Sequence, residues 1–228
     1  MTAEARSLIK KIIITDEMIP MPGGGVIQLS GTGAQRAEQA ANHLLKHGAA
    51  ALLSWGTAGG LAPNVPPGSL VIPSVVIGAD QSSYPTHPAW HERLFHRLKG
   101  CVDLYQGTLT ESTTVLKSST EKRILFERTG AIAVDMESCS VAGVAQKACV
   151  PFMAIRAISD SADMTVPQVS LDAVDEFGQI NVRRLIKGLS KHPLDLFPMI
   201  RLGRNFRSAQ ATLARVAHLA GSNFLVPQ

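Results

Sequence analysis

No Asp, Glu, Lys or Arg lies between Lys46 and Asp80. An uncharged stretch of this length first suggests a membrane span, which needs ~20 apolar residues in one helix. Proline and glycine interrupt it too often for a helix, at Gly56, Gly59, Gly60, Pro63, Pro66, Pro67, Gly68 and Pro73. Two short apolar runs remain, Ala50–Trp55 and Leu70–Ile77, each bounded by turn residues. They predict strands of a sheet that is covered on both faces.

The rest of the chain alternates between strand-like and helix-like segments. Strands are predicted at Ile12–Ile14, Val26–Leu29, Ala131–Val134 and Phe152–Ile158, and helices at Ala34–His47 and Met136–Ala148. Strand–helix–strand order favours parallel pairing through right-handed crossovers. We therefore predict an α/β fold of three layers, with a mostly parallel or mixed central sheet and helices on both faces.

Composition narrows the class of protein. Apolar residues make up 45% and charged residues 18% of the chain, so it can bury a large core, which excludes intrinsic disorder. The three cysteines lack C-x-x-C spacing, which excludes a disulfide scaffold or a zinc ribbon and suits a reducing compartment. The first residues lack the apolar core of a signal peptide. We expect a cytoplasmic protein.

The C-terminal part, residues 166–228, is predicted to be a helical extension packed on a domain of residues 1–165. Apolar residues recur at helical spacing in Val182–Leu189 and again in Met199–Ala220, with Gly221 as a C-cap. From Asn181 onwards there are eight Lys and Arg but one acid, whereas the preceding residues hold 14 bases and 17 acids. The basic helical face is either solvated or a peripheral contact with anionic lipid headgroups.

Several familiar motifs are incomplete or absent. Gly31-Thr-Gly33 begins like a dinucleotide-binding loop, but Arg36 stands where the third glycine belongs. His91 and His96 are five residues apart, so a helix would turn them about 140° away from each other, too far for one metal ion. The sequence has no P-loop and no G-x-S-x-G elbow. We expect no metal or organic cofactor.

Three segments carry the candidate chemistry. Ser54–Leu61 is glycine-rich and directly follows a predicted strand, so its backbone N–H groups can approach a ligand closely. Ala133–Ser138 places two acids at a strand-to-helix junction, and Arg156–Asp163 places Asp160 after an apolar strand. The carboxyl ends of parallel strands are where open α/β sheets bind ligands.

Each of these acids also has a purely structural interpretation. Asp135 is expected to cap the following helix, which is the commoner role at such a junction. Glu137 suits the first helical turn, where the helix dipole favours negative charge. Asp160 can cap the turn after its strand. Acids in an apolar setting are costly unless used or paired, however, which leaves a functional role open.

Together, the three segments resemble the nucleoside phosphorylase and nucleosidase superfamily. There, a G-[ST]-A-G-G-L loop, a V-x-M-E junction and an R-x-I-S-D strand end build one purine nucleoside site, and their order and rough spacing match here. The resemblance covers residues 1 to about 165. Ala131–Ser138 and part of the chain from Pro167 onwards also resemble the hopanoid-associated phosphorylase subgroup, which is similar to the methylthioadenosine/S-adenosylhomocysteine nucleosidases.

The resemblance implies a role for each matching residue. Asp160 matches the acid that protonates purine N7, a task for which burial should raise its pKa. Glu137 matches the carboxylate that binds the ribose hydroxyls and favours positive charge on the sugar ring. The other matches are Met136 beneath the ribose, Thr57 beside the sugar or nucleophile, Gly56, Ala58 and Gly59 in the same loop, and Val115, Leu116 and Ser159 around the base.

The nucleophile stays open between water and phosphate. Phosphorylases that this chain resembles hold phosphate with arginines, one of them at the place of Ser54, whereas hydrolytic members activate water with a glutamate that Glu4 matches. Both observations favour water, although Arg6 or Arg36 remains a candidate to bind phosphate as a co-substrate. The superfamily has a whole strand before that glutamate, and three residues precede Glu4 here. We therefore expect Glu4 to be mobile or displaced.

The function implied by the resemblance is cleavage of the N-glycosidic bond of a 5′-modified purine nucleoside with release of adenine. The expected substrate is adenosylhopane, in hopanoid biosynthesis. A methylthioadenosine/S-adenosylhomocysteine-type nucleosidase or a general purine nucleoside phosphorylase is one alternative. A nucleoside-binding protein that no longer catalyses is another. The superfamily also implies a homodimer, and we expect no nucleic-acid partner.

Overall fold

The computed structural model describes residues 2–8, 18–21, 24–173, 181–191, 193–221 and 224–227. The predicted strand Ile12–Ile14 lies outside these ranges. Before the main sheet come a short helix, α1 (Thr2–Ala5), and a small antiparallel pair, β1 (Ile19–Pro20) and β2 (Val26–Ile27). The strand predicted at Val26–Leu29 is therefore only two residues long and belongs to this separate pair.

The central sheet is mixed and closes on itself. Its strands are β3 (Leu52–Gly60), β4 (Leu70–Ile77), β5 (Ser83–Pro85), β6 (Leu104–Glu111), β7 (Ala133–Asp135) and β8 (Phe152–Asp160). Their order is β5-β4-β6-β7-β3-β8, and β4 also pairs with β8. The pairs β3–β8, β4–β6 and β6–β7 are parallel, and the others are antiparallel. The predicted α/β fold with a mixed sheet is confirmed.

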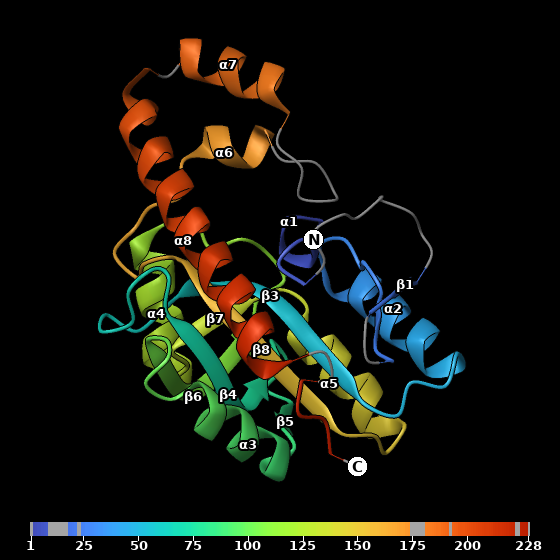
Figure 1. Cartoon of the computed structure of the whole chain (residues 1–228). Coiled ribbons are helices and arrows are strands. Elements are labelled where there is room, and N and C mark those ends of the chain that lie inside the picture. Colours follow the sequence, from blue (N-terminus) through green and yellow to red (C-terminus); the bar gives the residue numbers. More distant parts are fainter. Residues whose placement is uncertain are drawn as a thin grey trace.

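Helices cover both faces of the sheet (Figure 1). Helices α2 (Ala34–Lys46) and α5 (Ser138–Lys147) lie on one face, and α3 (Pro88–Leu98) and α8 (Leu196–Ala220) lie on the other. Strand β8 supplies both apolar cores, because Phe152, Ala154 and Ile158 enter one core and Met153, Ile155 and Ala157 enter the other. A strand that is apolar at nearly every position is thus buried on both faces.

Helix α8 has two different halves. Its C-terminal half buries Ala209, Leu213, Val216 and Ala220, and the helix ends at Gly221 with a φ of 75°, which confirms the predicted C-cap. The helix begins three residues earlier than predicted, because Pro198 fits into its first turn. It is preceded by α6 (Gln168–Ala173), α7 (Val182–Lys191) and the 3-10 turn η1 (Pro193–Asp195). Within the described ranges, none of the helices combines the length and apolar character needed to span a membrane.

The glycine-rich segment belongs to a strand. The prediction that the strand ends at Trp55 and a loop follows is wrong, because β3 continues to Gly60. Gly59 and Gly60 lie where β3 meets both β7 and β8. A Cβ atom on Gly60 would come within 2.9 Å of the carbonyl oxygen of Asp160. Glycine here permits the close approach of three strands.

Candidate active site

The three segments singled out in the sequence meet at Gly59. This residue pairs with Val134 in β7 and with Asp160 in β8. Thr57 lies two residues earlier on β3, and Glu137 follows the end of β7. The fold therefore brings Thr57, Glu137 and Asp160 to one end of the sheet.

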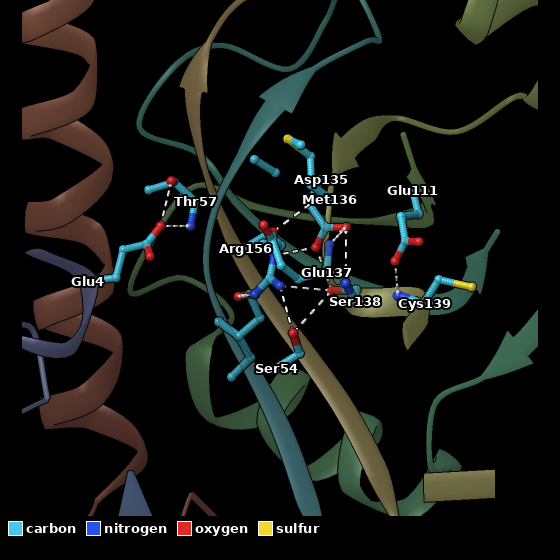
Figure 2. Close-up of polar contacts among 12 residues, drawn as sticks. Glu4, Ser54, Thr57, Glu111, Asp135, Met136, Glu137, Ser138, Cys139 and Arg156 are labelled. Atoms are coloured by element: carbon cyan, nitrogen blue, oxygen red, sulfur yellow. Dashed lines mark hydrogen bonds and ion pairs between the residues drawn. The ribbon is translucent and has the colours of Figure 1, made fainter. Parts of the chain in front are cut away.

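Glu4 is anchored at this same end, so the expectation that it is mobile or displaced is wrong. Its side chain is buried, and one carboxylate oxygen accepts hydrogen bonds from the backbone N–H and the hydroxyl of Thr57, both at 2.7 Å (Figure 2). Among the described residues, β3 pairs only with β8 from Leu52 to Ala58, so its other edge is open. The Glu4 carboxylate satisfies one backbone N–H group on that edge, which a neighbouring strand would otherwise bond.

The surroundings of Glu4 favour its ionised form. Burial alone would raise its pKa, but a nearby positive charge and the two hydrogen bonds from Thr57 hold the pKa below its ordinary value. Glu4 is therefore a carboxylate at neutral pH, which is the form that a general base requires.

Glu137 is held by the loop that precedes α2. The backbone N–H of Gly33 donates to Glu137 Oε1 at 2.8 Å, and Gly33 adopts a φ of 100°, a conformation that favours glycine. The incomplete dinucleotide motif Gly31-Thr-Gly33 thus has a role, which is to orient Glu137. Burial raises the pKa of Glu137, and the neighbouring Asp135 carboxylate adds to this effect. A carboxyl group of this kind suits hydrogen bonds with sugar hydroxyls.

A buried ion pair supports the junction beneath Glu137 (Figure 2). Arg156 Nε donates to Asp135 Oδ2 at 2.7 Å, and Arg156 Nη2 donates to the hydroxyls of Ser54 and Ser138 at 2.6 and 2.8 Å. Asp135 Oδ1 also accepts the backbone N–H of Ser138 at 3.2 Å, so its interpretation as a helix cap is partly right. Glu137 occupies the N-cap position itself. The network fixes the turn that presents Glu137.

Asp160 is not the isolated carboxyl group that the sequence suggested. Lys122 Nζ donates to Asp160 Oδ2, and the lysine side chain is buried. The same ammonium donates to the carbonyl oxygens of Ser161 and Met164 at 2.7 and 3.1 Å, and the Ser159 hydroxyl donates to Asp160 Oδ1 at 2.7 Å. Asp160 therefore sits next to a fixed cation rather than in purely apolar surroundings.

A cavity of about 540 Å³ lies beside Glu4, Thr57 and Glu137, along the open edge of β3. Its lining includes the apolar side chains Leu8, Met21, Trp55, Trp90, Phe224 and Val226, of which Trp90 and Phe224 are buried. The indole N–H of Trp55 donates to the Ser7 hydroxyl at 3.0 Å, and that of Trp90 donates to the Phe224 carbonyl at 2.7 Å. Because its N–H group has a partner within the protein, the half-buried Trp55 ring adds apolar surface to the cavity.

The predicted residues fall into two groups. Glu4, Gly56, Thr57 and Glu137 line the cavity, whereas Ala58, Gly59, Val115, Leu116, Met136, Ser159 and Asp160 lie outside its lining. Val115 is 42% exposed, and Leu116 packs against the apolar cluster around Leu61 and Val134. The cavity is thus lined by Glu4, Thr57 and Glu137 from the predicted sugar and nucleophile region but not by Met136, and the residues predicted around the base lie outside the lining.

Lys and Arg are scarce in the lining of this cavity. Among the described residues, Arg156 is the only Lys or Arg in its lining, and its guanidinium already bonds Asp135, Ser54 and Ser138. Arg6 is exposed, and Arg36 lies in α2 outside the lining. Two acids, Glu4 and Glu137, line the same space, so it is a poor environment for a phosphate dianion.

Residues 23–191 match the family model of the phosphorylase superfamily. The chain belongs to the phosphorylase superfamily. Its fold is similar to that of the methylthioadenosine/S-adenosylhomocysteine nucleosidase from Neisseria meningitidis in complex with methylthio-immucillin-A, with a TM-score of 0.69 and 19% identity over 96% of this chain and 95% of that one. It is also similar to the nucleosidase of the same type from Helicobacter pylori with a butylthio-DADMe-immucillin-A, with a TM-score of 0.68 and 18% identity over 96% and 92% of the chains.

A futalosine hydrolase from Helicobacter pylori has the same fold, with a TM-score of 0.66 and 19% identity over 96% of this chain and 94% of that one. Superfamily members of this fold thus include proteins named for different nucleoside substrates. At these identities the similarity establishes the fold, and the choice of substrate depends on the residues of this chain.

Sequence reasoning missed Lys122, although the sequence contains a signal for it. Lys122 precedes Leu125 by three residues and Phe126 by four in α4 (Ser119–Thr129), so it occupies the apolar face of that helix. A lysine at such a position is buried only with a partner. The partner, Asp160, lies 38 residues further along the chain, and only the fold brings the two together.

A second missed group is Glu111, at the end of β6. It accepts the backbone N–H groups of Cys139 and Ser140 at the start of α5, at 3.0 and 3.2 Å (Figure 2). Burial raises its pKa to about 7 despite these hydrogen bonds, and the negative charge of Asp135 adds to the shift. Glu111 borders a separate cavity of about 280 Å³ that Glu4 and Glu137 do not line.

Proposed function

We propose that the protein hydrolyses the N-glycosidic bond of a 5′-modified adenosine and releases adenine. One observation carries the proposal: three carboxyl groups, those of Glu4, Glu137 and Asp160, lie at the end of the sheet where β3, β7 and β8 meet, with Glu4 and Glu137 lining one cavity. Each has a different partner, which gives each a different electrostatic environment. Membership of the phosphorylase superfamily supports this reading of the site.

The departing base needs a proton, and Asp160 is the proposed donor. Asp160 takes up one proton from water when the nucleoside binds and passes it to purine N7, the C1′–N9 bond breaks, and its electron pair leaves with the base. The Lys122 ammonium, bonded to the same carboxyl group, stabilises the carboxylate that remains, and the proton that Glu4 takes from the attacking water returns to the solvent after the products leave. The Ser159 hydroxyl bonds the other oxygen and fixes the orientation of the group.

The sugar and the water are assigned to the other two acids. Glu137 binds the ribose hydroxyls and stabilises the positive charge that develops on the sugar ring as the bond breaks. Glu4, which is ionised at neutral pH, takes a proton from water, and the water oxygen bonds to C1′. The products are adenine and the free 5′-modified ribose.

Water is favoured over phosphate by the charges around the cavity. Phosphate binding in proteins relies on free Arg, Lys or backbone N–H groups. In the described lining, the one guanidinium is bonded to Asp135 and the N–H group of Thr57 is bonded to Glu4, and the nearby N–H group of Gly33 is bonded to Glu137. A phosphate ion would therefore meet acids and occupied donors.

The 5′ substituent is proposed to be large and apolar, as in adenosylhopane. The support is the apolar wall of the cavity, which includes the half-buried side chains Leu8, Met21, Trp55 and Val226, with the indole N–H of Trp55 already bonded to Ser7. A methylthio or homocysteinyl group would contact less of this wall. A substrate with one of these smaller groups corresponds to the alternative function, that of a methylthioadenosine/S-adenosylhomocysteine-type nucleosidase.

Adenine release from adenosylhopane, methylthioadenosine and adenosine, each with and without phosphate, tests the proposal. We expect release without phosphate, with the highest kcat/KM for adenosylhopane. Absence of release from all three would overturn the enzymatic proposal. Tight binding of adenosine analogues in that case would identify a nucleoside-binding protein, and strict dependence on phosphate would identify a phosphorylase.

A further inference from the structure

Exposed apolar side chains gather at one end of the molecule. Six of the nine large apolar residues exposed in the described part of the chain lie between residues 182 and 200, namely Val182, Ile186, Leu194, Leu196, Phe197 and Ile200. They belong to α7, η1 and the first turns of α8, which stand beyond the end of the sheet at the top of Figure 1. We refer to residues 181–191 and 193–207 as the hairpin. Leu194 is 88% and Phe197 is 80% exposed.

Helix α7 presents a basic edge next to an apolar edge. At 100° per residue, Val182 and Ile186 share one edge of the helix, and Arg183 and Lys187 lie on the next edge. The opposite side of α7 faces α6, where Gly188 lies so close to Val169 that a Cβ atom would clash with it. The apolar and basic edges therefore both remain exposed while the helix is held in place.

The start of α8 continues the same pattern. None of the residues of α8 before Ala209 is buried, although Arg201 and Asn205 reach Asp163 and Met164 of the body. Leu196, Phe197 and Ile200 are exposed on its first turns, and Arg204 follows one turn after Ile200 on the same side. The hairpin thus has an apolar tip with bases close behind it.

The charge of the hairpin is almost entirely positive. Between residues 181 and 207 the sequence holds seven Lys and Arg and one acid, Asp195. Arg201 is the exception among the arginines, because it lies 3.5 Å from Asp163 of the body. The remaining bases are exposed. A surface with this charge attracts anionic partners.

We propose that the hairpin docks the protein on an anionic lipid bilayer. The apolar tip enters the boundary between headgroups and acyl chains, and the bases contact headgroup phosphates, as amphipathic helices do when they lie in a membrane interface. A nucleic acid would satisfy the bases but leave Leu194 and Phe197 in water. A second copy joined through the same surface would oppose two strongly positive hairpins. An anionic bilayer accommodates both the exposed apolar side chains and the exposed bases.

The test is sedimentation of the full chain with vesicles. Binding is expected to vesicles of phosphatidylcholine with phosphatidylserine and to be weak with phosphatidylcholine alone, and salt should reduce it. Each base near the surface is expected to contribute about fivefold to binding. The triple variant Arg183→Gln/Lys187→Gln/Arg204→Gln should therefore bind about a hundredfold more weakly.

A matched control distinguishes docking through the hairpin from attraction by exposed bases elsewhere on the protein. Arg93→Gln/Lys99→Gln/Arg128→Gln removes three exposed bases from the body, and its binding should change little. The variant Leu194→Ser/Phe197→Ser should weaken binding to the anionic vesicles with its oligomeric state, measured by light scattering, unchanged. An absence of vesicle binding by the parent protein, or an equal loss in the body control, would refute membrane docking. Dissociation of an oligomer by Leu194→Ser/Phe197→Ser would instead identify the tip as a protein interface.

Discussion

Polar and apolar side chains are placed in opposite ways in the body of the protein and in the hairpin. In the body, Asp135 and Asp160 are buried and Glu137 is half-buried, all three have fixed partners, and apolar residues fill two cores. In the hairpin, bases and large apolar residues are both exposed, and α7 buries none of its residues. The difference fits the two proposed tasks, which are chemistry at a fixed site in the body and contact with a membrane surface at the hairpin.

Asp160→Asn is the substitution with the largest expected effect on catalysis. Asparagine keeps the shape of the side chain but cannot deliver a proton to N7, so kcat should fall by about 10²–10⁴-fold. Initial rates of adenine release measure this loss. The hairpin variant Leu194→Ser/Phe197→Ser should keep the parent rate with a water-soluble nucleoside. A near-normal rate in Asp160→Asn would remove this residue from the mechanism.

The two halves of α8 should respond differently to loss of an apolar side chain. Leu213 is fully buried against the sheet, so Leu213→Ala should lower the free energy of unfolding by about 2–5 kcal/mol. Phe197→Ser, in the exposed half, should change it by less than about 0.5 kcal/mol. Urea denaturation gives both values. Equal losses would show that the exposed half is packed against something in solution.

Substitutions of Lys122 distinguish a role of its ammonium in catalysis from a role in the stability of the fold. Lys122→Met leaves Asp160 without its partner, and kcat should fall about 10²-fold because the acid is no longer held in place. Lys122→Arg keeps a positive charge and should restore part of kcat, with KM changed less than kcat in both variants. Thermal unfolding measured in parallel reports any loss of folding. If both variants lose stability and keep kcat, the lysine only supports the fold.

Glu111 should make the stability of the body depend modestly on pH, an effect that the hairpin should not show. Its pKa is about 7 in the folded state, above the ordinary value of 4.5, so the folded state holds a proton that the unfolded state releases. The resulting stability is complete below pH 4.5 and declines as the pH rises towards about 7. Glu111→Gln should flatten this decline, which is worth about 1.4 kcal/mol per pKa unit at most. An unchanged slope in the variant would contradict the raised pKa.

Local patterns were sufficient for several elements and for part of the site. The apolar run Phe152–Ile158 predicted β8, and the spacing in α8 predicted the buried positions of its C-terminal half and its end at Gly221. Glu137 and Asp160 were found because they belong to short motifs. The closure of the sheet through β4 and β8 was not predictable, since this pairing joins Leu70 to Ala157 and depends on the whole fold.

The remaining errors also concern contacts between distant residues. The Gly33–Glu137 hydrogen bond spans 104 positions, and the Lys122–Asp160 pair spans 38. The strand ending at Trp55 was misjudged because glycine is unfavourable in strands in general, whereas the meeting of three strands at Gly59 requires it. Glu4 was expected to lack an anchor, yet the open edge of β3 supplies one through Thr57.

The most direct test of the proposed chemistry is to follow the oxygen that bonds to C1′. The enzyme is incubated with its nucleoside substrate in water labelled with oxygen-18, with unlabelled phosphate present, and the sugar product is analysed by mass spectrometry. We predict free 5′-modified ribose that carries the label, formed at a rate independent of phosphate and strongly reduced in Glu4→Gln. A sugar 1-phosphate without the label, formed only when phosphate is present, would contradict the account.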